Sequence, residues 1–476
     1  MKTPPDLAFA DLVSLSRMLS DGTVSARDLT ELYLDRIARH NAALNALIHV
    51  DADAARAEAD AADALRRAGA MAGPLHGIPI VVKDLCDVAG QPGTGGSLAL
   101  KDRRPLATAT VVKRLRAAGM VLIGRAHMVE FACGGWGTNQ YLGTPRNPWD
   151  RGVHRVPGGS SSGSGVTVAA GLAPAAIGSD TSGSIRIPAA LCGLTGLKPT
   201  HGRVSNANTM PLAHNQDSLG PMVRTAQDAA LIHAAISGPD PLDPATLGLP
   251  TAEDPLAGIG LGIAGRRFGV LPESHLDGVA DGVMVAYREA LKALEGLGAG
   301  IHEITPPERC EAVQPRSFLT IMSEGYSNLR HLLDDDSLPI GRHTKQRILT
   351  GQPLLAADYI ALQQDRIDSS RRWRASIDGM DALLTPTLPI SAIPVDEVDE
   401  DSLILGRFTR MVSYFGWCAL SVPAGLDGQG GSGGHGGLPI SLQIVCRPHE
   451  DALALRVGHA FQSTTDWHRQ TAPGWA

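Results

Sequence analysis

The chain has 476 residues, of which 43% are hydrophobic and 19% are charged, so it can bury a substantial core. Its formal net charge of −7 and its lack of Lys/Arg runs exclude the basic surface that nucleic-acid-binding chains present. The six scattered cysteines include no C-x-x-C pair, which argues against a zinc ribbon and against a disulfide framework.

The opening residues and the most apolar stretch bear on where the protein works. The opening MKTPPDLAFADL has prolines and acids where a signal peptide needs a basic start and an apolar run. Residues 166–177 are too few to span a bilayer, and they include Gly171 and Pro174. We therefore expect a cytoplasmic protein with reduced, buried thiols and with no membrane or nucleic-acid partner.

Residues 7–70 show helical periodicity. Apolar side chains such as Leu12 and Leu15 recur at helix spacing, and a second series of this kind begins at Leu29. Ser25, with Asp28 three residues later, predicts the start of that second helix. The alanine-rich stretch 51–70 has interleaved charges and predicts an exposed helix.

From Gly73 onward, short apolar runs alternate with helical segments. The runs predicted to be buried strands are residues 78–82, 121–123, 175–177 and 194–197, and the helices between them are 108–118 and 164–170. This alternation is typical of an α/β sheet with helices on both faces.

The second half of the chain begins with a proline-rich connection after Gly238, which predicts an excursion over the surface. A strand–helix–strand unit is predicted at residues 267–271, 282–297 and 300–304, followed by a helical region at 312–375. Two further strands are predicted at 382–386 and 440–445, and a flexible loop at 425–437. We expect one domain over 1–476, comprising N-terminal helices (1–70), a core (73–236), an inserted helical region (310–375) and a return to the sheet (380–476).

A lysine stands at the end of the predicted strand in IPIVVKD. Burial there would remove the hydration of Lys83, lower its pKa and allow it to act as a base. The plainer interpretation is a lysine that pairs with Asp84 or reaches solvent, and this stretch by itself leaves that alternative open.

Two runs of short side chains follow, PGGSSSGSG (157–165) and GSDTSGSIRIPA (178–189). Such runs let the backbone approach a ligand closely and present N–H groups to it. Neither run has the Gly-Lys-Ser/Thr ending of a P-loop or the G-x-G-x-x-G of a dinucleotide site. A serine-hydrolase elbow, G-x-S-x-G, occurs around Ser161, but it recurs around Ser432 inside the predicted flexible loop, so it is a weak signal.

VVKD, GGSSSGSG and GSDTSGSIRIPAALCGLTGLKPTHGRVS together resemble the amidase signature family. The resemblance covers essentially the whole chain and is densest over residues 73–236. It implies an α/β fold, in which a large mixed β-sheet is covered by helices on both faces and carries an inserted helical region. It also implies hydrolysis of a carboxamide C–N bond without a cofactor.

The resemblance assigns roles to three residues. It implies that Ser184 is the nucleophile, that Ser160 is a bridging serine held by a cis bond after Gly159, and that Lys83 is the base. A serine hydroxyl needs a hydrogen-bonded acceptor before it can attack, and a neutral lysine supplies one through the bridging hydroxyl. Asp180 and Arg186 are expected to support the loop.

The resemblance also implies an oxyanion hole and a pocket. The expected backbone donors to the oxyanion are Thr181, Ser182, Gly183 and Ser184. The expected substrate contacts are Phe131, Cys133, Trp136 and Tyr141, joined by Phe318, Met322 and Tyr326 from the helical region. For each of these residues taken singly, packing in the core is the favoured alternative. Together they favour an apolar or aryl acyl group, with carbamates and ureas as related substrates. The histidines lack metal-ligand spacing, so we expect no metal site.

The leading hypothesis is a free-standing amidase with a small-molecule amide as its partner and a homodimeric state by family habit. The alternative is the amidase subunit of a tRNA-dependent glutamine amidotransferase. That subunit has an acidic residue just before the match to Phe408 and Thr409, whereas this chain has Gly406 and Arg407. An arginine there would repel the ammonium group of glutamine. A silent scaffold and an α/β-hydrolase using Ser161 are further alternatives.

Overall fold

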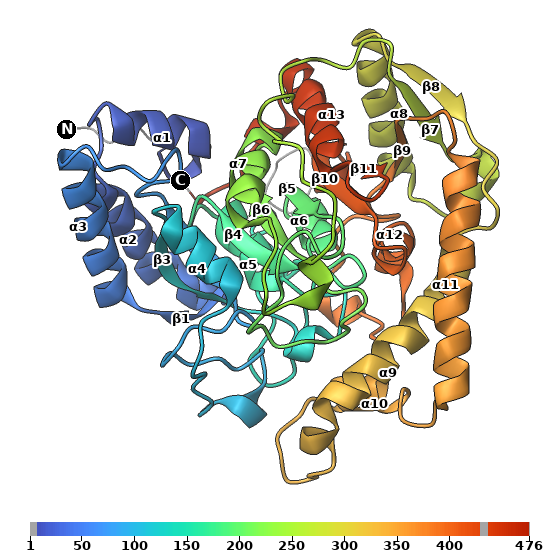
Figure 1. Ribbon diagram of the computed structural model, residues 1–476, viewed down its shortest axis with the longest axis horizontal. Helices are drawn as coiled ribbons and strands as arrows, with labels where there is room; N and C mark the ends of the chain where they lie inside the picture. The colour runs from blue at the N-terminus through green and yellow to red at the C-terminus, as the bar shows by residue number, and fades with distance from the viewer. Residues whose placement is uncertain (1–6, 429–436, 476) are drawn as a thin grey trace.

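A computed structural model of the chain describes residues 7–428 and 437–475 (Figure 1). Within these residues, eleven strands form a single sheet in the order β1-β3-β2-β4-β6-β5-β10-β11-β9-β7-β8. The strands are β1 Leu47–Val50, β2 Pro79–Lys83, β3 Val121–Ala126, β4 Ala176–Ser179, β5 Thr195–Lys198, β6 Leu219–Val223, β7 Arg267–Val270, β8 Gly300–Glu303, β9 Ala382–Pro386, β10 Cys418–Leu426 and β11 Pro439–Cys446.

The sheet mixes parallel and antiparallel pairs, as the expected fold class requires. Strand β2 runs parallel to both of its neighbours, β3 and β4, whereas β4, β6, β5, β10, β11 and β9 pair antiparallel in turn. The β5–β10 pairing joins strands from the two halves of the chain. The catalytic core and the C-terminal return therefore share one sheet.

Helices cover both faces of this sheet (Figure 1). They are α1 Leu12–Ser20, α2 Ala26–Leu44, α3 Ala52–Arg67, α4 Thr110–Ala117, α5 Ser162–Ala169, α6 Arg186–Leu191, α7 Ala226–Ile236, α8 Asp281–Gly296, α9 Gln314–Leu333, α10 Arg342–Leu349, α11 Ala356–Ser376, α12 Arg410–Tyr414 and α13 Asp451–Thr464. None of these helices, all within the described ranges, has the length and apolar character that a membrane span requires.

Strand β2 is buried on both of its faces. Ile80 and Val82 contribute to the hydrophobic cluster under α4, α7, α8 and α13, whereas Val81 contributes to the cluster under α2, α5 and α6. A strand covered in this way reads as a continuous apolar run, which is why IPIVV is recognisable from the sequence. The same burial surrounds Lys83, the last residue of the strand.

The N-terminal helices follow the predicted pattern with one correction. Ser25 and Asp28 form a complete capping box at the start of α2. Helix α3, predicted to be an exposed helix, has a buried face that includes Ala55 and Ala59. Its Asp63 accepts hydrogen bonds from the first backbone amides of α2, so the acidic residue orders a neighbouring helix.

Three strands were absent from the sequence prediction: β1, β6 and β10. Pro221 interrupts the apolar pattern of β6 and Pro423 that of β10. Each strand pairs with a strand from a separate part of the chain, β6 with β4 and β10 with β5. Of the loop predicted at residues 425–437, the first two residues belong to β10, and residues 429–436 lie outside the described residues.

Helices α9, α10 and α11 follow β8 and precede β9 in the chain, at the predicted helical region. In Figure 1, α11 runs from near the strands at the upper right of the view down toward α9 and α10, and α9 contacts α10, α11 and α12. Through these contacts, the helical region lies next to the glycine- and serine-rich loops of the core.

Candidate active site

Lys83 reaches two serine hydroxyls from the end of β2. Its Nζ lies 2.7 Å from Ser160 Oγ and 2.8 Å from Ser179 Oγ, and its side chain is 0% exposed. Burial lowers the pKa of Lys83 to about 7, because the surroundings cannot hydrate its charged form. The alternative of a lysine that pairs with Asp84 is wrong, since Asp84 binds Arg125 instead.

A second buried lysine, Lys198 on β5, gives a useful contrast. Burial lowers the pKa of Lys198 to about 8. Its Nζ, however, donates to the backbone carbonyls of Pro199 and Trp417. An amine fixed by carbonyl oxygens supports the backbone, whereas the amine of Lys83 faces hydroxyls that can exchange a proton with it.

The segment before α5 brings Ser160 to Lys83. The peptide bond between Gly159 and Ser160 is cis, as the resemblance implies. A side chain at position 159 would come within 2.8 Å of Val129 Cγ2 and of the Gly137 amide, so only glycine fits there. The carbonyl of Ser160 accepts a 3.0 Å hydrogen bond from the Val129 amide, which holds the segment against the loop after β3.

Ser184 lies on the loop between β4 and α6, beside the segment that carries Ser160. Its carbonyl accepts a 3.3 Å hydrogen bond from the Ser161 amide. Its hydroxyl makes no hydrogen bond with any described residue, and Ser184 lines a pocket. Ser161, the α/β-hydrolase candidate, is fully buried, and its hydroxyl bonds the backbone of Ser179 rather than a histidine.

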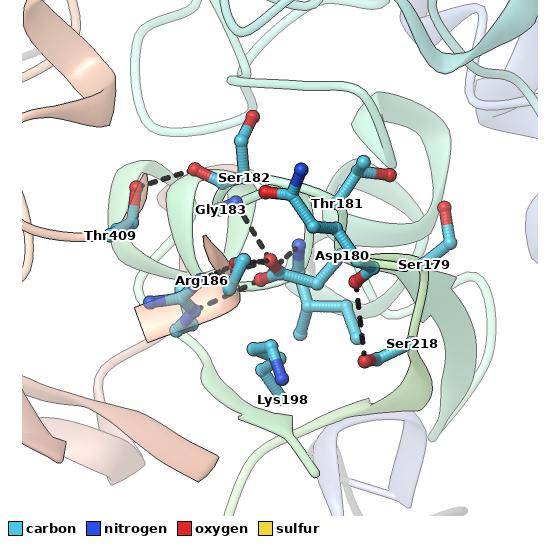
Figure 2. A network of polar contacts seen from close by, with 12 residues as sticks. Ser179, Asp180, Thr181, Ser182, Gly183, Arg186, Lys198, Ser218 and Thr409 are labelled. Atoms are coloured by element: carbon cyan, nitrogen blue, oxygen red, sulfur yellow. Dashed lines mark hydrogen bonds and ion pairs between the residues drawn. The ribbon is translucent and has the colours of Figure 1, made fainter. Parts of the chain in front are cut away.

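An ion pair inside the loop fixes its shape, as Figure 2 shows. Asp180 accepts hydrogen bonds from Arg186 at 2.9 and 3.0 Å and from the backbone amides of Gly183 and Ile185. Although burial alone would raise it, the pKa of Asp180 is lowered to about 2 by the Arg186 guanidinium. Thr409 Oγ1 donates to the Ser182 carbonyl on the other side of the loop.

These contacts narrow the set of backbone donors expected at the oxyanion. The Gly183 amide donates to the Asp180 carboxylate at 2.7 Å, so its inclusion among the free donors needs correction. The amides of Thr181, Ser182 and Ser184 have no hydrogen-bond acceptor among the described residues. Ser182 and Ser184 also line the pocket, where a reacting carbonyl would sit.

The pocket that Ser184 lines is a hollow of about 540 Å³ with its open mouth included. Of the four residues expected to contact substrate, Cys133 and Trp136 line it. Phe131 and Tyr141 do not: Phe131 is buried in the main core, and Tyr141 is 45% exposed, so their contact with substrate stays a prediction without support from the pocket. From the helical region, Phe318 and Met322 line the pocket and Tyr326 does not.

Three residues near this site were missed from the sequence. Ser179 is the second hydroxyl partner of Lys83, and its place before Asp180 in GSDTSGS was the available signal. Arg347 and Arg410 line the pocket, where no sequence motif announced them. Arg407, expected near the substrate, points elsewhere: its guanidinium donates to the carbonyls of His275 and Asp277 and pairs with Glu311.

All six cysteines are buried and unpaired. Among the residues that the structure describes, no group of three or more His, Cys, Asp or Glu side chains could hold a metal ion.

The chain is similar in sequence and in fold to known amidases. The amidase family model matches residues 28–455. The chain is 38% identical to a subunit of the glutamyl-tRNA(Gln) amidotransferase from Halorhodospira halophila, over 98% of this chain and 99% of that protein. Among solved structures, the peptide amidase from Stenotrophomonas maltophilia has a TM-score of 0.84 at 30% identity, covering 97% of this chain and 98% of that one.

A chain from a vestigial protein complex, described as revealing the evolutionary origins of an s-triazine catabolic enzyme, has a TM-score of 0.88. It is 34% identical, with 96% of this chain and 98% of that chain covered.

These relatives overturn one expectation. We expected a small-molecule amide as the partner of this chain, with no nucleic acid. The curated relatives, at 37–40% identity, are named as one subunit of an amidotransferase that acts on glutamyl-tRNA(Gln), so the expectation of a small-molecule partner without nucleic acid is wrong. The homodimeric state stays a prediction. A net charge of −7 describes only this chain, whereas one member of an assembly can leave RNA contacts to another.

The match over residues 28–455 and the identity over nearly the full chain lead to the same conclusion as the lysine and serines at the sheet. The chain belongs to the amidase family, whose members are hydrolases of amide C–N bonds.

Proposed function

We propose that this chain hydrolyses a carboxamide through an acyl-enzyme on Ser184, with Ser160 and Lys83 as its proton relay. The observation that carries the proposal is the 2.7 Å distance between Lys83 Nζ and Ser160 Oγ in a site closed to water. A buried amine whose pKa is lowered to about 7 is neutral often enough at physiological pH to accept a proton.

The reaction then has two steps, acylation of Ser184 and hydrolysis of the acyl-enzyme. In the first, Ser184 Oγ attacks the amide carbon as its proton passes to Ser160 and the Ser160 proton passes to Lys83. The C–N bond breaks as the relay returns a proton to the departing amine. In the second, water attacks the acyl-enzyme, loses its proton through the same relay and releases a carboxylic acid and the Ser184 hydroxyl.

Two further features support the proposal. No hydrogen bond to a described residue fixes the Ser184 hydroxyl, and the hydrogen bond from the Ser161 amide to the Ser184 carbonyl keeps Ser184 beside the segment that carries Ser160. The free amides of Ser182 and Ser184 belong to residues that line the pocket, where negative charge would develop, and the free amide of Thr181 is next to them in the chain. A donor of this kind is worth about 10²–10³ in rate.

Replacement of the two candidate serines tests the choice of nucleophile. We expect Ser184→Ala to lower kcat by about 10⁴-fold or more, because the acyl-enzyme cannot form. Ser161→Ala should retain measurable turnover, because its hydroxyl bonds only backbone. Ammonia release from an amide panel measures both. Loss of activity in Ser161→Ala alone would end the scheme.

The pH dependence tests the base. Lys83 accepts a proton only when it is neutral, so wild-type kcat/KM should fall as pH decreases through about 7 and level off above it. Lys83→Met should remove that plateau and leave a slow rate that rises with hydroxide concentration. A pH–rate profile from pH 5 to 10 measures both proteins. An unchanged profile in the variant would show that Lys83 has no part in catalysis.

Gly183 tests the loop. Its φ of +133° suits glycine, and an added Cβ would meet Thr409 Oγ1 and come within 2.8 Å of Ile187 Cδ1. We expect Gly183→Ala to displace the neighbouring amides and lower kcat by about 10²–10³. The matched control is Gly296→Ala, where the same change meets open space. Wild-type kcat in a folded Gly183→Ala protein would contradict the proposal that the neighbouring backbone amides stabilise the oxyanion.

The curated relatives favour a second, narrower candidate. They are named as a subunit of the glutamyl-tRNA(Gln) amidotransferase and match 95–98% of this chain. On that basis, this chain would release ammonia from glutamine inside an assembly that brings the tRNA. The absence of an acidic residue at Gly406, which lines the pocket, stands against glutamine as the amide.

Reconstitution separates the two candidates. If this chain is such a subunit, it should replace its relative in the Ralstonia nicotianae amidotransferase and restore glutamine-dependent amidation of glutamyl-tRNA(Gln). The Ser184→Ala protein is the control. Amide hydrolysis by the chain, with no amidation and no stimulation by the other subunits, would exclude the subunit role while leaving the hydrolase proposal in place.

A further inference from the structure

Two arginines line the pocket beside Ser184 without any acidic neighbour in its wall. Arg347 comes from α10, and Arg410 is the first residue of α12. The other described residues of the wall are apolar, small or neutral, and Trp136, Phe318 and Met322 are among them. The part of the pocket that the structure describes therefore has two positive charges and no negative one.

Arg410 is buried, yet its guanidinium has no partner. Its side chain is 7% exposed, its Nε is closed off from solvent, and it makes no hydrogen bond or ion pair with a described residue. A buried charge is costly unless it is paired.

Other buried arginines of this protein are paired. Arg186 bonds Asp180, Gln443 and Ser413, and Arg125 bonds Asp84. Arg36, which is buried beside α5, donates to three backbone carbonyls. The contrast indicates that the partner of Arg410 comes from outside the chain.

Arg347 adds a second charge to the same place. Its guanidinium lies 5.7 Å above the ring of Phe318 and pairs with no carboxylate in the described part of the chain. Burial, followed by the nearby charge of Arg347, lowers the pKa of Arg410 to about 10. Glu400 lines the adjoining hollow with Arg347, but its carboxylate accepts a 2.5 Å hydrogen bond from Thr138.

We propose that Arg347 and Arg410 bind a carboxylate on the acyl part of the substrate, so that the preferred amides are anionic and have no ammonium group. This inference rests on the proposed function, because the scissile carbonyl must lie at Ser184. A guanidinium presents a planar fork of donors that matches a carboxylate. The monoamide of a short dicarboxylic acid has this form, and its methylenes suit the apolar wall of the pocket.

The described wall of the pocket contains no carboxylate, so it has no group that would bind an ammonium group of the substrate. An ammonium group next to the substrate carboxylate, as in glutamine, would stand near two guanidinium groups without a counter-charge. We therefore expect discrimination between glutamine and glutaramate, which is the same molecule without its amino group.

The test compares amides of equal length. Malonamate, succinamate and glutaramate are paired with propanamide, butanamide and pentanamide, and glutamine is added. We expect the best carboxylate amide to exceed its neutral match by about 10- to 100-fold in kcat/KM, the range of a charge-assisted hydrogen bond. Glutaramate should also exceed glutamine. Equal rates within the pairs, or a preference for glutamine, would overturn the inference.

Variants assign the preference to residues. In Arg410→Gln, the ratio of kcat/KM for a carboxylate amide to kcat/KM for its neutral match should fall close to one, mainly because the anionic amide reacts more slowly. In Arg347→Gln, the same ratio should fall only in part. Arg410→Lys, which keeps the charge and loses the fork, should be intermediate. The control is Arg407→Gln, three residues away and bonded outside the pocket, which should keep the wild-type ratio. An unchanged ratio in folded Arg410→Gln would overturn the assignment.

A binding measurement makes the test independent of turnover. Titration calorimetry of the Ser184→Ala protein with succinate and glutarate should show binding that weakens at least about tenfold in the Arg410→Gln background. Absence of binding by both dianions would overturn the inference. Ser184-dependent hydrolysis with no charge preference removes only this inference, whereas hydrolysis that survives Ser184→Ala removes the proposed function itself.

Discussion

The dry contact between Lys83 and two serine hydroxyls is the constraint on which the site depends. Lys83 ends a strand that is buried on both faces, so water cannot stabilise its charge. The amine must instead be matched by the hydroxyls of Ser160, on the segment before α5, and of Ser179, the last residue of β4. The parallel pairing of β2 with β4 brings Ser179 beside Lys83, because both residues end their strands at the same edge of the sheet. Ser160 is held there by the hydrogen bond that its carbonyl accepts from the Val129 amide.

The loop that carries Ser184 owes its shape to groups that take no part in the proposed chemistry. Asp180 binds Arg186 and two backbone amides, and Arg186 also reaches Gln443 on β11 and Ser413 on α12. These contacts tie the loop to the C-terminal half of the chain. The amides that they leave free are those beside the pocket, so the support network determines which donors a substrate can meet.

The family and the pocket give different kinds of information about substrate. Relatives of this chain include subunits of an amidotransferase and a peptide amidase, so membership settles the bond that is cleaved but not the molecule that contains it. The wall of the pocket comes from α9, α10, α12 and the loops of the core. Its charge balance, two arginines against no acid among the described residues, is a property of this chain.

By itself, the sequence determined the fold class and most strands, because apolar runs are local signals. Its resemblance to the amidase family singled out Lys83, Ser160 and Ser184 as the candidates for the site. Tertiary structure decided the rest. Strands β6 and β10 each contain a proline, and each pairs with a strand from a separate part of the chain, β6 with β4 and β10 with β5. Arg410 differs from Arg407 only in its place on the fold, yet one arginine lines the pocket and the other bonds carbonyls away from it. The direction of a side chain depends on packing that no local pattern encodes.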